Sequence, residues 1–504
     1  MSIGQKLLHG TFWTTVGVVV SRVMALVTIG IIGRILGKEG FGYYSIVTST
    51  VLLLTPLAAG GQFSLAARNI GLWKITDKQR CGGVIPFVML TSGLAGTVFA
   101  AAMFLSSEWL ANTVLREPGV ASYLRVVSPY VLLGALATAG SGVLVGFRGF
   151  REQAETEFLS SIFAFPATVV LAWRLGMLGG IIGLLLYTGC KVFLLHHFGA
   201  KLSRANGISR SWGMVTVLLP LLGTFVVPSL LTYAVSAPAL WGANALLVRE
   251  PGGPAQMGIF GASNYLRGAV LFLPSAIAPV MLPLMMETAG ESKDPTAFHR
   301  VVSMSVRLNV LLVCPVSVFL VVAAKGVLYL VYGQGFVEGH HVLGLMAWAI
   351  GFQAISTSVI QAMIGRAKMW LFFLVNLISS LVLILSAWLF VGRWGAEGLA
   401  TSHVVGWAIQ LIVALVIRAK FLDAPIAFSE WRLLIASVGA LLLAGVVGAY
   451  STQVIGLVLG VPMSVGAGLL LLTLGFAKSE RSAAFRLLRS RLAVLIPQLG
   501  IHDA

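Results

Sequence analysis

The chain has 504 residues, of which 58% are hydrophobic and only 10% are charged. An average soluble domain is about 25% charged, so this chain lacks the side chains to cover a water-facing surface. The composition excludes a soluble enzyme, a nucleic-acid-binding protein and a secreted disulfide scaffold, and predicts a polytopic membrane protein. In such a protein the net charge of +17 reflects Lys and Arg residues in cytoplasmic loops.

Apolar stretches of about 20 residues, the length that crosses a bilayer as a helix, recur along the whole chain. Charged residues, Gly and Pro separate about fourteen of them. The predicted spans are 13–33, 41–60, 84–106, 123–147, 157–174, 178–198, 216–247, 257–284, 303–323, 341–363, 370–391, 397–417, 433–451 and 454–476. The loops between them are too short for a soluble domain, so the sequence predicts an all-α fold.

Lys and Arg gather in the loops that are cytoplasmic if the N-terminus lies inside, and far fewer lie in the opposite loops. Because positively charged loops are retained in the cytoplasm, both termini are predicted to be cytoplasmic. The first residues carry no signal-peptide pattern, so the first span is expected to stay in the protein. Cys81, Cys190 and Cys314 are scattered, which indicates neither a disulfide framework nor a metal site.

The C-terminal segment 477–504 differs in kind from the rest of the chain. Its apolar residues can line one helical face while arginines occupy the others; the apolar residues are Phe485, Leu488, Leu492 and Leu495. This pattern predicts a basic amphipathic helix on the anionic inner leaflet. A plain topology anchor is the alternative.

Three loop patterns occur twice, in the same order and at nearly the same spacing. The pairs are Phe41-Gly42-Tyr43-Tyr44 with Met257-Gly258-Ile259-Phe260, Gly149-Phe150 with Gly365-Arg366, and Arg174-Leu175-Gly176 with Arg393-Trp394-Gly395. They predict two parallel six-helix lobes, at 1–205 and 206–420, followed by an extra helix pair at 421–476. In transporters built from parallel repeats, substrate binds between the halves and access alternates. Chance similarity among Gly-rich loops is the alternative.

Two arginines fall where a membrane helix ordinarily carries none. Arg22 lies at the middle of its span, and Arg267 lies near mid-depth of the span 257–284. An Arg at mid-membrane costs at least about 2.5–3.5 kcal/mol and normally faces a cavity or a partner. Every Asp and Glu falls in a loop, in a tail or at a span end, so we predict that both arginines line a cationic, water-filled cavity that selects anions. Snorkelling or bonding to backbone carbonyls is the alternative.

Uncharged polar residues within the spans are secondary candidates for the same surface. Ser21 and Asn264 lie beside the two arginines in the chain, and Asn244 and Gln353 lie within other spans. Such residues more often hydrogen-bond a neighbouring helix than a ligand. The sequence shows no catalytic triad, no metal-ligand spacing and no phosphate-cradling Gly motif. We therefore expect no catalytic residue, no bound metal, no cofactor and no enzymatic activity.

Several motifs between about residues 10 and 420 carry a family likeness. Gly10-Thr11-Phe12-Trp13, Ser21-Arg22 and the stretch from Gly33 to Gly42 resemble the start of Wzx-type polysaccharide flippases, members of the multidrug/oligosaccharidyl-lipid/polysaccharide exporter superfamily. The stretch from Met257 through Arg267 and on to Pro283 resembles the eighth helix of that family, and Val331-Tyr332-Gly333 its loop after helix nine. The likeness covers the twelve repeat helices.

The resemblance implies a V-shaped pair of six-helix lobes around a central cavity. It implies that the protein moves polyprenyl-pyrophosphate-linked oligosaccharide from the inner to the outer leaflet of the bacterial plasma membrane, for surface polysaccharide biosynthesis. Its partners would be membrane lipids and other polysaccharide assembly proteins, with no nucleic acid. The diphosphate would pair with Arg22 and Arg267, because guanidinium groups form charge-assisted hydrogen bonds with phosphate.

Three alternatives remain open. Fourteen spans also resemble the peptidoglycan lipid II flippases of the same superfamily, but those typically add a cationic residue on the second helix, and 41–60 has none. A multidrug exporter would share the fold and is expected to carry a membrane carboxylate. A membrane glycan polymerase or ligase would need a larger outer loop with paired catalytic groups. The sugar, the polymer and the energy source stay open.

Overall fold

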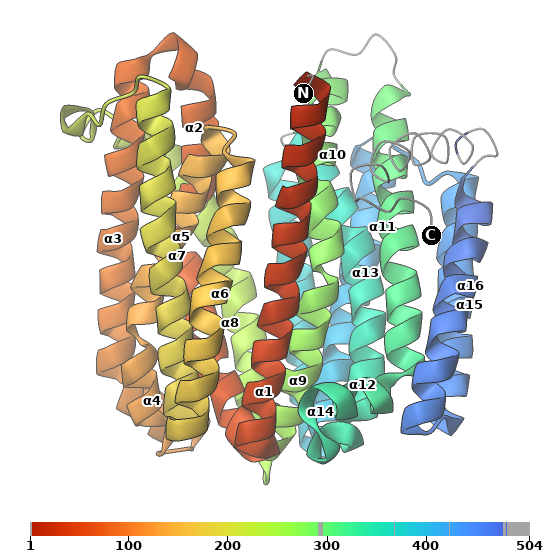
Figure 1. Cartoon of the computed structure of the whole chain (residues 1–504). Coiled ribbons are helices and arrows are strands. Elements are labelled where there is room, and N and C mark those ends of the chain that lie inside the picture. The colour runs from red at the N-terminus through yellow and green to blue at the C-terminus, as the bar shows by residue number, and fades with distance from the viewer. Residues whose placement is uncertain (1–2, 291–295, 367, 423, 477–479, 481–504) are drawn as a thin grey trace, which may run out of the picture. The chain divides into compact units, whose positions relative to one another are not determined.

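A computed structural model of the chain describes residues 3–290, 296–366, 368–422, 424–476 and 480 (Figure 1). The described residues form helices and connecting turns, without a β-strand. In chain order the α-helices are α1 (Ile3–Ala59), α2 (Gln62–Thr76), α3 (Lys78–Trp109), α4 (Val120–Val127), α5 (Pro129–Gly146), α6 (Phe150–Leu175), α7 (Met177–Ala205), α8 (Val227–Val248), α9 (Gly253–Val270), α10 (Phe272–Gly290), α11 (Ala297–Val322), α12 (Ala324–Tyr332), α13 (His340–Gly365), α14 (Met369–Phe421), α15 (Phe428–Tyr450) and α16 (Gln453–Gly475).

The all-α polytopic fold is confirmed. Among the described residues, 11 helices are long and apolar enough to cross a membrane. Two of the α-helices, α1 with 57 residues and α14 with 53, are more than twice the length that a bilayer requires. Each is broken by a glycine outside the helical conformation, Gly37 in α1 and Gly395 in α14, so each holds two predicted spans. The other predicted spans fall on α3, α4 with α5, α6, α7, α8, α9 with α10, α11, α13, α15 and α16.

Two short helices were not expected. The segment of α2 lies between the predicted spans 41–60 and 84–106 and contains Gln62, Arg68, Asn69 and Lys74 among its apolar residues. In the structure one face of α2 is buried by Leu65, Ala66 and Ile70 against α3 and α5, so α2 is an amphipathic helix. The second is α12, a helix too short to span a bilayer. The predicted amphipathic helix at 477–504 lies outside the described residues, apart from Glu480.

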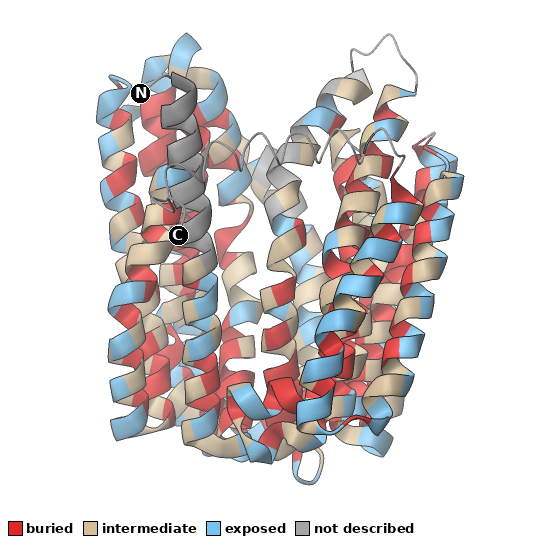
Figure 2. Cartoon of the chain, turned by 45° about the vertical axis from the view of Figure 1, so that its right-hand side comes forward, coloured by how far each residue is buried: buried red, intermediate tan, exposed pale blue. Residues whose placement is uncertain are grey.

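The helices fall into two compact units. Unit 1 consists of the described residues within Met1–Ala269, Leu328–Val342 and Asn376–Gly406. Unit 2 consists of the described residues within Val270–Val327, Leu343–Val375 and Trp407–Ala504. In both units the buried positions lie on helix faces turned toward neighbouring helices (Figure 2). The exposed faces carry large apolar side chains, such as Phe193 and Trp388 in unit 1 and Ile435 in unit 2. Such faces are expected where a helix meets lipid.

The backbone of unit 1 repeats itself at glycines that the sequence pairs. Gly176 ends α6 with φ 58° and ψ −130°, and Gly395 breaks α14 with φ 53° and ψ −126°. An L-residue rarely adopts this conformation. Three residues later, an added Cβ on Gly179 would lie 1.9 Å from the carbonyl oxygen of Leu171, and one on Gly398 would lie 2.3 Å from that of Phe390. The two hairpins therefore close in the same way, which supports the internal repeat.

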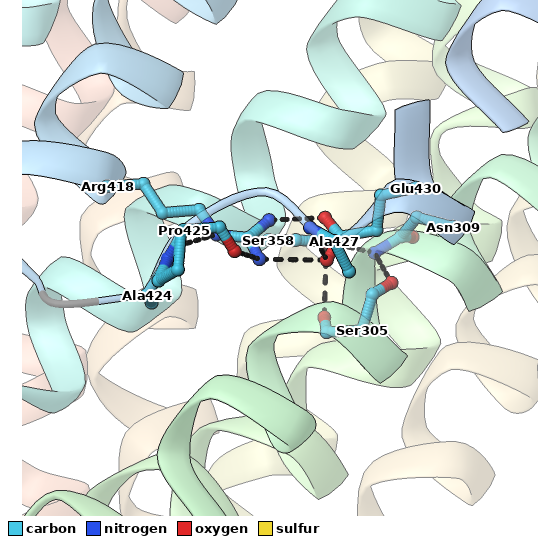
Figure 3. A network of polar contacts seen from close by, with 8 residues as sticks. All are labelled: Ser305, Asn309, Ser358, Arg418, Ala424, Pro425, Ala427 and Glu430. Carbon is cyan, nitrogen blue, oxygen red and sulfur yellow. Dashed lines mark hydrogen bonds and ion pairs between the residues drawn. The ribbon is translucent and has the colours of Figure 1, made fainter. Parts of the chain in front are cut away.

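In unit 2 the extra helices α15 and α16 pack side by side and against α11. A fully buried ion pair fixes the start of α15: Arg418 Nη1 lies 2.5 Å from Glu430 Oε2 (Figure 3). The same guanidinium donates to the carbonyl oxygens of Ala424 and Pro425. Arg418 directly follows the predicted span 397–417, and its side chain is 0% exposed. The turn between α14 and α15 is thus built around one arginine.

Candidate functional site

A cavity of about 300 Å³ lies inside unit 1, between α1, α5, α6, α7 and α9. Its polar lining includes one guanidinium, four phenol groups and hydroxyl groups. These belong to Arg22, Tyr44, Tyr130, Tyr187, Tyr265, Thr48, Ser161 and Thr168. We call it the Arg22 cavity. An apolar cavity with a few converging polar groups is the usual form of a small-molecule site.

Of the predicted site residues, only Arg22 lines this cavity. Its neighbour Ser21 is buried and is absent from the cavity lining, as expected for consecutive residues that point in different directions on a helix. Arg22 lines the cavity and is exposed. Its part in binding a substrate stays a prediction.

Arg267 and Asn264 lie one turn apart on α9 and are joined by a hydrogen bond, with Arg267 Nε donating to Asn264 Oδ1 at 3.0 Å. Between them in the chain, Tyr265 turns the other way: it lines the Arg22 cavity, and its hydroxyl lies 2.9 Å from Thr48 Oγ1. The structure thus brings Asn264 and Arg267 together, but Arg267 does not line the Arg22 cavity. A joint role for the two arginines stays a prediction.

Asn244 and Gln353 lie apart from this cavity. Asn244 is on α8, and its Oδ1 is buried with no described donor within hydrogen-bond distance. One turn earlier, Trp241 Nε1 donates to Thr50 Oγ1 at 2.9 Å, which ties α8 to α1. Gln353 is on α13 in unit 2. Their part in substrate binding stays a prediction.

Glu157, the first residue of the predicted span 157–174, is largely buried between α6 and α7. The predicted span begins at this residue, but α6 begins at Phe150, two turns earlier. The Glu157 side chain is 16% exposed, and its Oε1 lies 2.5 Å from Lys191 Nζ on α7. Tyr187, one turn before Lys191, donates its hydroxyl to Glu157 Oε2 at 2.8 Å. The sequence carried one signal for this pair, since Lys191 falls within the span 178–198.

Positive charge exceeds negative charge where Glu157 and Lys191 lie beside the Arg22 cavity. Tyr187 lines the cavity and Ser161, one turn beyond Glu157, lines it too. Arg22 acts electrostatically on both Glu157 and Tyr187. We call Arg22, Glu157, Tyr187 and Lys191 the charge cluster. Its two cations outnumber its one carboxylate. The charge cluster therefore has a net positive charge and can attract an anion.

The predicted repeats meet inside unit 1 at their predicted outer ends. Arg34, at the end of the first span, donates to the carbonyl oxygens of Tyr329, Leu330 and Val331, the last turn of α12. Lys38 Nζ lies 2.6 Å from Glu338 Oε1. These contacts join the turn inside α1 to the segment between α12 and α13.

An aromatic cluster lies beside these polar contacts. The Phe41 ring centroid lies 5.5 Å from that of Tyr332, 5.8 Å from that of Phe336 and 5.8 Å from that of Tyr265. Aromatic pairs at these separations attract each other beyond simple burial. Unit 1 is therefore closed at the predicted outer end of the repeats by polar and aromatic contacts together.

The part of the chain that the structure describes contains no cluster of metal-ligand residues. Among these residues no group of three or more His, Cys, Asp or Glu side chains gathers where a metal ion would be held. His340 and His341 lie side by side, with ring centroids 4.0 Å apart, but no carboxylate or thiol joins them among the described residues. The chemistry that the charge cluster offers is anion binding.

Comparison with known sequences identifies the type of protein. A family described as polysaccharide biosynthesis protein matches residues 31–341. The chain is 21% identical over 439 residues to the lipopolysaccharide biosynthesis protein WzxC of Escherichia coli (strain K12), covering 86% of this chain and 84% of WzxC. It is 23% identical over 282 residues to the EPS I polysaccharide export inner membrane protein EpsE of Ralstonia solanacearum, covering 55% of this chain and 62% of EpsE.

Comparison with solved structures identifies the fold. The lipid II flippase MurJ, in an inward closed conformation, matches with a TM-score of 0.71 and 13% identity, over 91% of this chain and 98% of MurJ. An inward-facing multidrug resistance MATE family transporter of the MOP superfamily matches with a TM-score of 0.64 and 16% identity, over 80% of this chain and 95% of that protein. At these identities the likeness concerns the fold alone.

Proposed function

Because the chain belongs to the polysaccharide biosynthesis protein family, a group of multi-pass membrane transporters, we propose that it flips polyprenyl-pyrophosphate-linked oligosaccharide from the inner to the outer leaflet of the plasma membrane. The cargo would serve surface polysaccharide biosynthesis together with other assembly proteins. The observation that carries the proposal is the Arg22 cavity, where a guanidinium stands among four tyrosines inside a membrane bundle. A diphosphate needs a cation of this kind, and sugars need hydroxyl partners and flat apolar faces.

In this proposal the cargo divides between two environments. The diphosphate pairs with Arg22, whose planar guanidinium presents several donors at once to phosphate oxygens. The sugar hydroxyls meet Thr48, Ser161 and the tyrosine hydroxyl groups, and the prenyl chain stays in lipid. Arg267 would meet the diphosphate in a later stage of the cycle. In the structure its guanidinium is engaged in a hydrogen bond with Asn264.

Access to the cavity alternates in the proposed cycle. The lobes at 1–205 and 206–420 would rock against each other, as in other transporters built from repeats, with both termini in the cytoplasm. Release to the outer leaflet requires that Arg34 leave the carbonyl groups of α12 and that the ion pair of Lys38 with Glu338 separate. Because both contacts are at least partly solvent-exposed, they are weak enough to break in each cycle.

The test uses a strain that lacks this protein and carries the intact chain, Arg22→Ala or Arg267→Ala. Arg174→Ala is the matched control, because Arg174 is exposed and lies over Trp173 outside the cavity. The measurements are the amount of polyprenyl-pyrophosphate oligosaccharide in lipid extracts and its access to a membrane-impermeant probe. We expect inaccessible glycolipid to accumulate without the protein and with Arg22→Ala, and to clear with the intact chain and the control. If the strain that lacks the protein accumulated no such glycolipid, the proposed cargo would be wrong.

A multidrug exporter is the second candidate, and one observation favours it. Glu157 supplies the intramembrane carboxylate that such an exporter is expected to carry. Its pairing with Lys191 argues for an anionic cargo instead, because the carboxylate is neutralised by the ammonium group. Efflux of ethidium from cells that express the protein, lost in Glu157→Gln, would favour the exporter. A lipid II flippase is tested in the same strain by measuring lipid II in place of the oligosaccharide.

A further inference from the structure

We propose that Lys191 is a second anion-binding residue of the Arg22 cavity and that Glu157 is its resident counter-ion, from which Lys191 turns away when the diphosphate enters. The inference rests on the proposed function and deepens it by assigning a residue pair to the phosphate groups. It concerns a lysine on α7 and a glutamate on α6, neither of which stands out as a site residue in the sequence.

The position of the pair is the first argument. Glu157 and Ser161 lie one turn apart on α6, and Tyr187 and Lys191 lie one turn apart on α7. Ser161 and Tyr187 both line the cavity, so the ion pair is one turn away from the lining on both helices. An extended lysine side chain spans about one turn of a helix, which is close to 5.4 Å. The Nζ of Lys191 can therefore reach the cavity without any movement of the backbone.

The balance of charge is the second argument. A diphosphate esterified at both ends carries two negative charges, and the guanidinium of Arg22 neutralises one. In the structure the carboxylate of Glu157 holds the Lys191 ammonium at 2.5 Å, so that neither charge is buried alone. An unpaired charge in a membrane interior is costly. A resident carboxylate removes this cost while the carrier returns empty.

The third argument is the fate of Glu157 once Lys191 leaves it. Its Oε2 accepts a hydrogen bond from the hydroxyl of Tyr187 at 2.8 Å, and Arg22 also acts on this carboxylate. The phenol remains as a donor when the ammonium group turns to the phosphate, so the carboxylate is not left without a partner. Tyr187 would thus hold Glu157 in place while Lys191 alternates between the carboxylate and the diphosphate.

A purely structural ion pair is the competing explanation. The helices α6 and α7 already approach closely, since an added Cβ on Gly183 would lie 2.4 Å from the Thr168 side chain. An ion pair between them would add to that packing and take no part in binding. The two explanations differ for the variant in which both charges are removed. Glu157→Gln/Lys191→Gln leaves no unpaired charge behind. If the pair is only structural, the double variant should bind the diphosphate as the intact protein does. If Lys191 binds the diphosphate, the double variant should bind it more weakly.

The experiment measures calorimetric binding of farnesyl diphosphate, with farnesol as the uncharged control, to the purified full-length protein in detergent. The variants are Arg22→Gln, Glu157→Gln, Lys191→Arg and the double variant Glu157→Gln/Lys191→Gln, each with its melting temperature. We expect the double variant to bind about tenfold more weakly than the intact protein, which is the effect of losing one charged contact. Glu157→Gln should bind about threefold more tightly, because a competing anion is gone, and Lys191→Arg should stay within about threefold.

The outcomes separate the inference from the function on which it rests. If Arg22→Gln weakens binding while the double variant binds as tightly as the intact protein, the pair is structural and the inference is overturned, although the flippase stands. If the intact protein binds farnesyl diphosphate no more tightly than farnesol, recognition of the diphosphate fails and both are overturned. Weak binding by the double variant at an unchanged melting temperature supports Lys191 as an anion-binding residue.

Discussion

Gly42 on α1 and Gly258 on α9 touch each other across the two predicted repeats, each through the backbone of the other helix. An added Cβ on Gly42 would lie 1.7 Å from the carbonyl oxygen of Pro254, and one on Gly258 would lie 1.8 Å from that of Lys38. Each glycine thus meets the residue four positions before its partner. A contact that is the same from both sides is expected where two elements are related by a twofold axis, as the predicted repeats would be.

This contact predicts that a single methyl group added at Gly258 prevents the close approach of α9 to α1. Gly258→Ala should push α9 away from α1, because backbone atoms cannot yield as a flexible side chain does; overpacking of this kind costs about 1–3 kcal/mol. The measurement is the yield of a disulfide between Lys38→Cys and Glu338→Cys after the three native cysteines are replaced. We expect the yield to fall severalfold in Gly258→Ala. Gly268→Ala is the control on the same helix, since nothing lies within 4 Å of its added Cβ; an equal loss there would contradict the prediction.

Arg34 predicts a second effect at the same end of unit 1. Three carbonyl oxygens of α12 accept hydrogen bonds from its guanidinium, and a lysine ammonium cannot reproduce that fork. Both Arg34→Ala and Arg34→Lys should therefore loosen the closure. The test labels a cysteine at Thr48, in the Arg22 cavity, with an impermeant thiol reagent applied from outside. Faster labelling in both variants is expected, and unchanged labelling would assign the closure to other contacts.

The buried pair of Arg418 and Glu430 predicts a large loss of stability. Both side chains are fully buried, and removing one partner of such a pair costs about 3–5 kcal/mol because the other charge is left unpaired. Glu430→Gln should thus lower the melting temperature strongly. Arg151→Gln, which breaks an exposed pair with Glu155, should have little effect. If both variants melt alike, the buried pair does not hold α15 in place.

The charge of the cargo predicts that the membrane potential assists flipping. An anion that moves outward from a negative interior gains about 2.3 kcal/mol per charge per 100 mV. Proteoliposomes with a potassium gradient should flip a fluorescent prenyl diphosphate faster when valinomycin sets the interior negative. The same vesicles without valinomycin are the control. Equal initial rates in the two conditions would show that no net charge crosses with the cargo.

Much of the fold could be predicted because its signal is local. Each span is an apolar stretch of bilayer length, and the turn at Gly395 repeats a pattern around Gly176. The burial of Arg418 and Glu157 could not be predicted, because a charged residue near a span end looks the same whether it faces water or a partner on another helix. That Arg22 lines a cavity follows from its place in mid-span, where an arginine normally faces a cavity or a partner; its role in binding stays a prediction. For Arg267 the cavity depends on which face of α9 turns inward, and Tyr265 takes that face.

The glycine turns in α1 and α14 also decide where the protein accepts added sequence. At Gly37 and Gly395 the chain reverses within one residue, so there is no loop to lengthen and an inserted tag would shift the register of two helices at once. The turn at Pro251 and Gly252 is different: both residues are exposed, and nothing lies within 4 Å of an added Cβ on Gly252. Epitope tags and fluorescent reporters therefore belong between Pro251 and Gly252, in the exposed part of this turn and before the buried residues Gly253 and Pro254.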